Sequence, residues 1–126
     1  MSKSIQLALV AHDAKKDLLI EWARPNLSRL SQCTLFGTGT TGTRLNEELS
    51  LDVTRMKSGP LGGDAQLGAM IAEGRLDGLI FFTDPLSALP HDVDVKSLLR
   101  LAVYYDTPLA MSPSTADAVL DALVKT

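Results

Sequence analysis

Residues 78–83 of the chain read GLIFFT, a continuous apolar run that ends in threonine. Such a run is typical of a strand buried on both faces, as in a parallel sheet that helices cover on each side. Residues 5–11 (IQLALVA) have the same character and predict a second buried strand. Shorter runs at residues 33–36, 53–56 and 108–111 complete a set of five predicted strands.

Amphipathic stretches alternate with these strands, and the spacing of their apolar residues predicts five helices. Asp13 stands at the N-cap position of the first helix, and Pro25 should end or kink that helix near Arg24. Gly74 is expected to end the third helix. Strict alternation indicates the α/β class, with three layers in which a five-stranded parallel sheet lies between helices. The predicted helices span residues 13–30, 43–49, 65–73, 95–105 and 114–125.

Length and composition restrict the class of protein. The 126 residues, of which 45% are hydrophobic, predict one domain over residues 1–126. The net charge of −3, without a basic tract, argues against nucleic-acid and anionic-membrane binding. No apolar stretch is long enough to span a membrane, and the N-terminus does not resemble a signal peptide. The single cysteine, Cys33, excludes an internal disulfide and a multi-cysteine metal site, so we expect a cytoplasmic protein.

Polar segments follow four of the predicted strands. Six of the nine glycines lie in residues 37–42 (GTGTTG) and 59–63, which we interpret as loops after the second and third strands. His12 and Asp13 follow the first strand, and residues 84–94 follow the fourth. Because the carboxyl ends of parallel strands meet at one edge of a sheet, we expect the functional site there.

The sequence GTGTTG matches the G-x-G-x-x-G pattern of dinucleotide-binding proteins, but its context differs. That pattern belongs to the first strand–helix turn and needs an acidic residue at the end of the next strand. Here the motif follows the second strand, and the third ends in Lys57 and Ser58, so NAD binding is not favoured. Backbone N–H groups and threonine hydroxyls at a helix start instead suit a phosphate group. The alternative is a tight turn without a ligand.

Asp64 and the two histidines are the strongest candidates for chemistry. Residues 58–64 (SGPLGGD) lead to Asp64 at a predicted helix start, where it is either a positioned base or an ordinary N-cap. His12 and His91 both lie in segments at the same edge, which favours a role in the site over a structural one. A metal site with nearby aspartates lacks the usual histidine spacing, and no G-x-S-x-G motif supports a serine hydrolase.

Five blocks of the sequence stand out together: VAHD (10–13), TGTTG (38–42), SGPLGGD (58–64), IFFTDP (80–85) and PHDVDVKSLLRL (90–101). Taken together, they resemble the methylglyoxal synthase family over most of the chain. The resemblance implies a Rossmann-like sheet in the order 3-2-1-4-5, with a switch point between the first and fourth strands. It implies a lyase that converts dihydroxyacetone phosphate to methylglyoxal and inorganic phosphate in a glycolytic bypass. It also implies a homohexamer without metal or cofactor, with inorganic phosphate as product and expected inhibitor.

The resemblance also assigns roles to individual residues. Asp64 matches the catalytic base and His91 the histidine that moves protons between substrate oxygens, with Asp94 beside them. Asp13 and Asp84 match supporting acids. The residues that match substrate and phosphate contacts are His12, Lys16, Thr38, Gly39, Thr40, Thr41, Ser58 and Gly59.

Three other functions remain open on the residues alone. They are a non-catalytic domain that senses a phosphate ligand, a sugar-phosphate isomerase that retains the phosphate, and a nucleotide-binding module. The presence of Asp64 together with both histidines favours catalysis over sensing.

Overall fold

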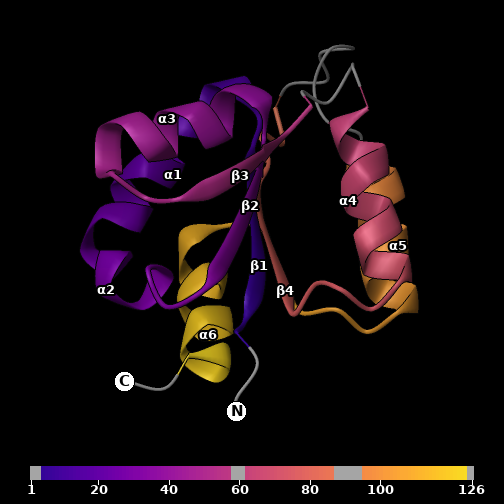
Figure 1. The fold of residues 1–126 in the computed structure, drawn as a ribbon. Coiled ribbons are helices and arrows are strands. Elements are labelled where there is room, and N and C mark those ends of the chain that lie inside the picture. Colours follow the sequence, from indigo (N-terminus) through magenta and orange to yellow (C-terminus); the bar gives the residue numbers. More distant parts are fainter. Residues whose placement is uncertain (1–3, 58–61, 87–94, 125–126) are drawn as a thin grey trace.

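Five parallel strands form the sheet at the centre of the molecule, in the order β3-β2-β1-β4-β5 (Figure 1). The computed structural model describes residues 4–57, 62–86 and 95–124. The predicted α/β class and strand order are both confirmed. The strands are β1 (Gln6–Ala11), β2 (Thr34–Thr38), β3 (Val53–Met56), β4 (Gly78–Phe82) and β5 (Leu109–Ala110).

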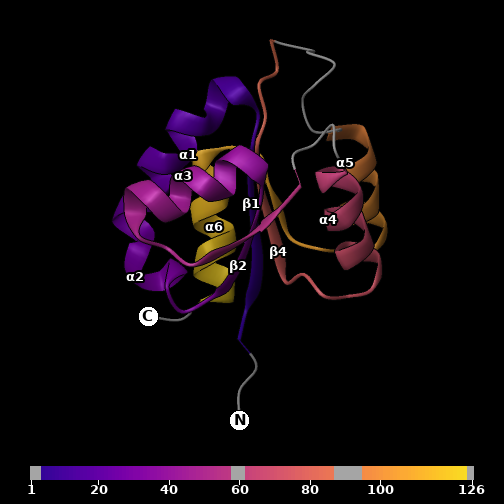
Figure 2. The same ribbon diagram turned by 45° about the horizontal axis from the view of Figure 1, so that its top comes forward.

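Helices cover both faces of the sheet and make the three layers that the alternating pattern predicted (Figures 1 and 2). Four helices lie on one face: α1 (Lys16–Ala23), α2 (Leu27–Leu30), α3 (Gly39–Leu49) and α6 (Pro113–Leu123). The other face carries α4 (Gly63–Ala72) and α5 (Val95–Tyr104). No helix among the described residues is long and apolar enough to cross a membrane.

The core consists of two apolar clusters, one on each face of the sheet. In β1, Leu7 and Leu9 join the cluster under α1, α3 and α6, while Ala8 and Val10 join the cluster under α4 and α5. The side chains of β4 alternate in the same way between the two clusters. A strand alternates its side chains between faces, so a continuous apolar run fits only a strand that is covered on both sides.

The first predicted helix is interrupted, as Pro25 indicated. Helix α1 ends at Ala23, and a 3-10 turn over Arg24–Asn26 contains the proline before α2 begins. The predicted cap at Asp13 is wrong, because a 3-10 turn over Asp13–Lys15 already includes this residue and His12 occupies the N-cap position. Asp13 instead accepts a hydrogen bond of 2.7 Å from Lys16 Nζ.

The sequence GTGTTG does not form a loop, which corrects our interpretation. Gly37 and Thr38 continue β2 and pair with β3, and α3 begins at Gly39. A Cβ atom on Gly37 would lie 3.2 Å from the Leu9 carbonyl oxygen, and one on Gly42 would lie 2.8 Å from Arg55 Cγ. The glycines therefore allow the first turn of α3 to pack directly on the sheet. This packing outweighs the low helix propensity of glycine and threonine.

Candidate functional site

His12 lies at the carboxyl end of β1, beside the end of β4. Its backbone N–H donates to the Phe82 carbonyl at 3.0 Å, and its ring packs edge-on against Phe81. The backbone N–H of Asp84 donates to His12 Nδ1 at 2.9 Å. The predicted switch point between the first and fourth strands thus brings His12 and Asp84 together, although they are 72 positions apart in sequence.

The bond from Asp84 determines which nitrogen of His12 carries the proton. Because Nδ1 accepts a hydrogen bond, its lone pair is occupied and the ring proton is on Nε2. His12 is only 6% exposed, so this orientation is held by its surroundings. The carboxylate of Asp84 acts separately and accepts a bond of 3.0 Å from the Leu86 N–H. Asp84 therefore supports His12 through its backbone N–H.

The first turn of α3 presents backbone donors that no side chain caps. Thr38 occupies the N-cap position and its hydroxyl makes no capping bond. Thr38 and Thr41 are buried, whereas Thr40 is exposed. The Thr41 hydroxyl is fully enclosed and has no hydrogen-bond partner among the described residues. Uncapped N–H groups and the positive end of the helix dipole form a favourable environment for an anion.

Lys16 begins α1, immediately after the turn that carries Asp13. Its ammonium group is bonded to the Asp13 carboxylate at 2.7 Å, and the Lys16 side chain is 17% exposed. Asp13 therefore positions the lysine near the carboxyl end of β1, and its supporting role in the site stays a prediction.

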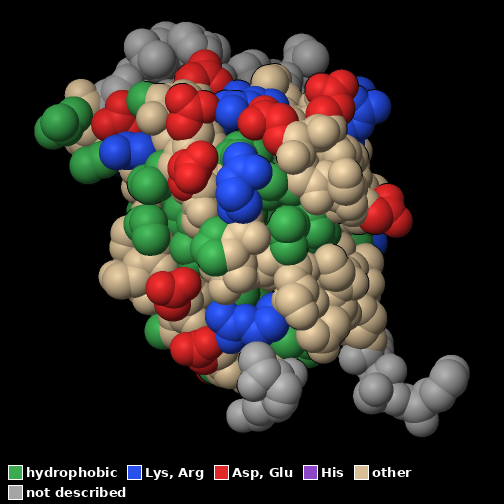
Figure 3. Space-filling model, turned by 90° about the vertical axis from the view of Figure 1, so that its left-hand side faces the viewer, with side chains coloured by type: hydrophobic (Ala, Val, Ile, Leu, Met, Phe, Trp, Pro, Cys, Tyr) green, Lys and Arg blue, Asp and Glu red, His purple; other side chains and the backbone are tan. Residues whose placement is uncertain are grey.

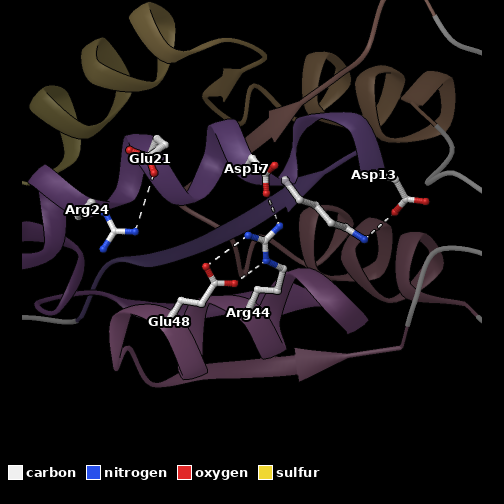
Figure 4. A network of polar contacts seen from close by, with 7 residues as sticks. Asp13, Asp17, Glu21, Arg24, Arg44 and Glu48 are labelled. Atoms are coloured by element: carbon white, nitrogen blue, oxygen red, sulfur yellow. Dashed lines mark hydrogen bonds and ion pairs between the residues drawn. The ribbon is translucent and has the colours of Figure 1, made fainter.

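Arg44 connects α3 to α1 (Figure 4). Its Nη1 donates to Asp17 at 2.8 Å, and its Nε donates to Glu48 at 2.6 Å. The bond from Arg44 holds the pKa of the Glu48 carboxyl below its usual range. Acidic and basic side chains are interspersed over this face of the molecule, without a large patch of one sign (Figure 3). The contacts of Arg44 hold α1 and α3 together, and these helices begin at two predicted phosphate-binding residues, Lys16 and Gly39.

Asp64 lies in the first turn of α4, but it is not the N-cap. Gly62 takes that position with a φ of 109°, a conformation that favours glycine. Asp64 Oδ1 accepts a bond of 2.8 Å from the Ala65 N–H, and Oδ2 makes no hydrogen bond to any of the described residues. The N-cap alternative is therefore wrong for Asp64, which is half-buried, and its role as a base stays a prediction.

Gln66 is a residue that the sequence analysis missed. Its Oε1 accepts a bond of 2.9 Å from the Lys57 backbone N–H. This contact joins the end of β3 to the helix that carries Asp64. No pattern in the sequence indicated it, because the two residues lie on different elements.

A surface hollow of about 480 Å³ is a second feature that the sequence analysis missed. Its lining includes Arg55 and Lys57, which stand on either side of Met56 at the end of β3. Arg55 Nη1 donates to Thr43 Oγ1 at 2.8 Å. Gly39, the first residue of α3, lines the same hollow. The sequence pattern around Lys57 indicates only that the acidic residue of NAD-binding proteins is absent there, and it gives no sign of this hollow.

Four of the predicted site residues lie outside the described part of the chain. They are Ser58, Gly59, His91 and Asp94. Within the described ranges, no group of three or more histidine, cysteine or acidic residues is arranged to hold a metal ion.

Comparison with known proteins gives a consistent result. A family model described as "MGS-like domain" matches residues 18–111. A methylglyoxal synthase of Rhizobium etli is 55% identical over 124 residues, covering 98% of each chain. A methylglyoxal synthase of Pseudoalteromonas atlantica is 58% identical over 114 residues, covering 90% of this chain and 84% of that relative.

A solved structure extends the similarity to three dimensions. The crystal structure of methylglyoxal synthase from Elizabethkingia anophelis NUHP1 is 50% identical in sequence, with a TM-score of 0.90. The match covers 93% of this chain and 77% of that chain. Its fold agrees with the sheet and helices described above, and the sequence identity extends over nearly the whole chain. This chain belongs to the methylglyoxal synthase family.

Proposed function

We propose that this chain is a carbon–oxygen lyase that converts dihydroxyacetone phosphate to methylglyoxal and inorganic phosphate. The observation that carries the proposal is the uncapped start of α3 next to His12 at one sheet edge. Leu9 pairs with Gly37 in the sheet, so His12 and Thr38 end neighbouring strands. Relatives at 55% and 58% identity are named methylglyoxal synthase, which supports the same reaction.

The phosphate group of the substrate would bind at the first turn of α3. Backbone N–H groups of residues 39–41 and the hydroxyls of Thr40 and Thr41 are the available donors. A bound phosphate oxygen would give the enclosed Thr41 hydroxyl the partner that the described residues do not supply. Lys16 would add a positive charge from α1.

Asp64 would start the reaction by removing a proton from the hydroxymethyl carbon next to the carbonyl group. Its Oδ2 is the oxygen for this step, since Oδ1 is bonded to the Ala65 N–H. The electron pair of the C–H bond becomes the double bond of an enediolate. His12 would donate from Nε2 to a substrate oxygen and stabilise the developing charge. His91 is proposed, on the family resemblance, to move protons between the substrate oxygens, with Asp94 in support.

Elimination then completes the reaction. The hydroxyl group on the first carbon gives up its proton to the departing phosphate, and the O–H bonding pair becomes the C=O bond of the aldehyde. The pair of the enediolate double bond forms a new double bond to the terminal carbon, and the C–O bond to phosphate breaks. Inorganic phosphate leaves with that bonding pair, and the remaining enolate takes a proton on carbon to give methylglyoxal. This step requires the C–O bond to stand roughly perpendicular to the enediolate plane. The grip of α3 on the phosphate would determine that torsion, and so direct the intermediate to elimination rather than isomerisation.

An assay that follows methylglyoxal and inorganic phosphate together tests the proposal. We expect equal amounts of both products from dihydroxyacetone phosphate, and a loss of about 10²- to 10⁴-fold in Asp64→Asn. Asp52→Asn is the matched control, because Asp52 is exposed and precedes β3 at the opposite edge of the sheet. Saturable binding of phosphate without any turnover would contradict the proposal and favour a sensing domain.

The role of α3 in product choice has its own test. Thr40→Ala and Thr41→Ala should weaken phosphate binding and raise the share of aldose phosphate among the products. The role would be disproved by variants in which both phosphate affinity and the ratio of elimination to isomerisation stay at wild-type values.

Assembly and setting complete the proposal. We propose one domain over residues 1–126, a homohexamer in the cytoplasm, and a reaction that bypasses part of glycolysis without metal or cofactor. Inorganic phosphate would inhibit by competing for the start of α3. Light scattering should give a mass near six times that of the 13.5 kDa chain. Activity should survive treatment with EDTA.

A further inference from the structure

The hollow beside α3 combines two basic side chains with the start of a helix. Arg55 and Lys57 approach it from β3, and Gly39 approaches it as the first residue of α3. Thr43 and Met56 complete its described lining. The end of β3 lies next to the start of α3 in the fold, at the carboxyl edge of the sheet (Figure 1). The hollow therefore adjoins the predicted phosphate site and shares Gly39 with it.

Arg55 is held in place by contacts that do not neutralise it. Its Nη1 donates to Thr43 Oγ1 at 2.8 Å, and Thr43 Oγ1 in turn donates to the Gly39 carbonyl at 3.2 Å. Its aliphatic stem lies against Gly42, where even a Cβ atom would come within 2.8 Å of Arg55 Cγ. These contacts fix the guanidinium beside the first turn of α3 and leave most of its N–H donors available.

The charge of Arg55 and Lys57 is not compensated by the rest of the described structure. Arg24, Arg29, Arg44 and Arg75 each form an ion pair with a carboxylate. Neither Arg55 nor Lys57 has an acidic partner at ion-pair distance among the described residues. The chain as a whole carries a net charge of −3. An approaching dianion is therefore repelled by the molecule as a whole and attracted locally to this hollow.

We propose that Arg55 and Lys57 form a docking site for a phosphate dianion at the entrance to the start of α3. The ligand class is a phosphate monoester or inorganic phosphate, which present the same charge to the two side chains. Naming dihydroxyacetone phosphate as the ligand rests on the proposed function. The docking site captures the dianion and raises its local concentration, after which the N–H groups of α3 bind it. It acts through charge and takes no part in proton transfer.

Calorimetric titration of the whole chain with inorganic phosphate tests the docking site directly. At an ionic strength of about 0.01 M, where the Debye length is about 30 Å, Arg55→Gln/Lys57→Gln should raise the Kd about five- to tenfold. At about 1 M, where that length is about 3 Å, the difference should fall below about twofold. Arg75→Gln is the matched control, because Arg75 is exposed and follows the carboxyl end of α4, away from the hollow.

Arg55→Lys separates charge from structure. This variant loses the planar donor that bonds to Thr43 but keeps the positive charge. Because the docking site acts through charge, the Kd for phosphate should stay within about twofold of the wild-type value. The single variant Arg55→Gln is measured beside Arg55→Lys. If Arg55→Lys weakens phosphate binding as much as Arg55→Gln does, the proposal is overturned, because the bond to Thr43 and not the charge would then explain the loss. A double variant with wild-type affinity at low salt, or a deficit that persists at high salt, would overturn it as well.

Turnover of dihydroxyacetone phosphate distinguishes this inference from the proposed function. In the double variant the loss should fall mainly on KM and should shrink as salt is added. If the protein turns over the substrate but the double variant binds phosphate as well as wild type does, the proposed function stands and the docking site is overturned. If the protein shows no turnover but its phosphate binding depends on Arg55 and Lys57, the docking site stands and the proposed function is overturned.

Discussion

His12→Asn and His12→Gln should affect stability and activity in opposite order. An asparagine Oδ1 can occupy the position of His12 Nδ1 and accept the Asp84 N–H, whereas a glutamine amide reaches the position of Nε2. The asparagine variant therefore retains the bond between the ends of β1 and β4. The glutamine variant loses that bond but retains a donor toward the site.

The expected difference follows from the contacts of the imidazole ring. Both variants lose the edge-on packing of His12 on Phe81, which costs each about 0.5–1.5 kcal/mol. Only His12→Gln leaves the Asp84 N–H without its acceptor, at a further cost of about 1–2 kcal/mol, since this bond is partly buried. The free energy of unfolding should thus be lower for His12→Gln than for His12→Asn by about 1–2 kcal/mol.

Urea unfolding measures the stability order, and the two-product assay measures the activity order. The midpoint should fall further in His12→Gln while the slope of the unfolding free energy stays constant, because the surface exposed on unfolding is nearly the same. Turnover should fall further in His12→Asn, which lacks a donor near the position of Nε2. Equal stability of the two variants, or the same order in both assays, would refute the role assigned to the bond between Asp84 and His12.

Three further predictions concern other parts of the molecule. The Trp22 Nε1–H donates to Asp117 Oδ1 at 2.8 Å, and Asp117→Ala removes this acceptor. Urea unfolding should show a free energy of unfolding lower by about 1–2 kcal/mol. A cost near zero would mean that water replaces the carboxylate. Because Arg44 lowers the pKa of Glu48, the ion pair between them should stabilise the fold at neutral pH, and this contribution should be lost as the pH falls below about 4.3. In a Glu48→Gln variant, the free energy of unfolding should therefore fall less steeply with decreasing pH on the acid side. An unchanged pH dependence would contradict this linkage. Burial, with a smaller contribution from the Asp77 carboxylate, raises the pKa of the Cys33 thiol. The thiol should therefore react with iodoacetamide at pH 8 more slowly than free cysteine does. An equal rate would show that the thiol is not protected.

Part of the candidate site was predictable because parallel strands all end at one edge. The sequence placed His12, Asp84 and the GTGTTG segment at the ends of strands, and the structure brings them together at the carboxyl edge of the sheet. The contacts of Gln66 and Arg55 were not predictable, since each involves a residue on another element. The roles of Ser58, Gly59, His91 and Asp94 stay predictions.

Local pattern alone determined the class of the fold. The apolar runs of β1 and β4 require cover on both faces, and the alternating amphipathic stretches supply helices to provide it. Local pattern misread GTGTTG as a loop, because glycine and threonine are weak helix formers. Only the tertiary structure decided that α3 begins there. The Leu9 carbonyl leaves little room for a side chain at Gly37, and the Arg55 stem would have to shift to admit one at Gly42, so both positions favour glycine.

The proton position on His12 has the same origin. No property of the segment around His12 selects Nε2 over Nδ1 as the protonated nitrogen. The selection comes from the backbone N–H of Asp84, which reaches Nδ1 only because β1 and β4 are neighbours in the sheet. The amino-acid sequence thus determined which chemical groups are present at the edge, and the packing of distant strands decided their orientation, since orientation depends on atoms that are neighbours only in the folded chain.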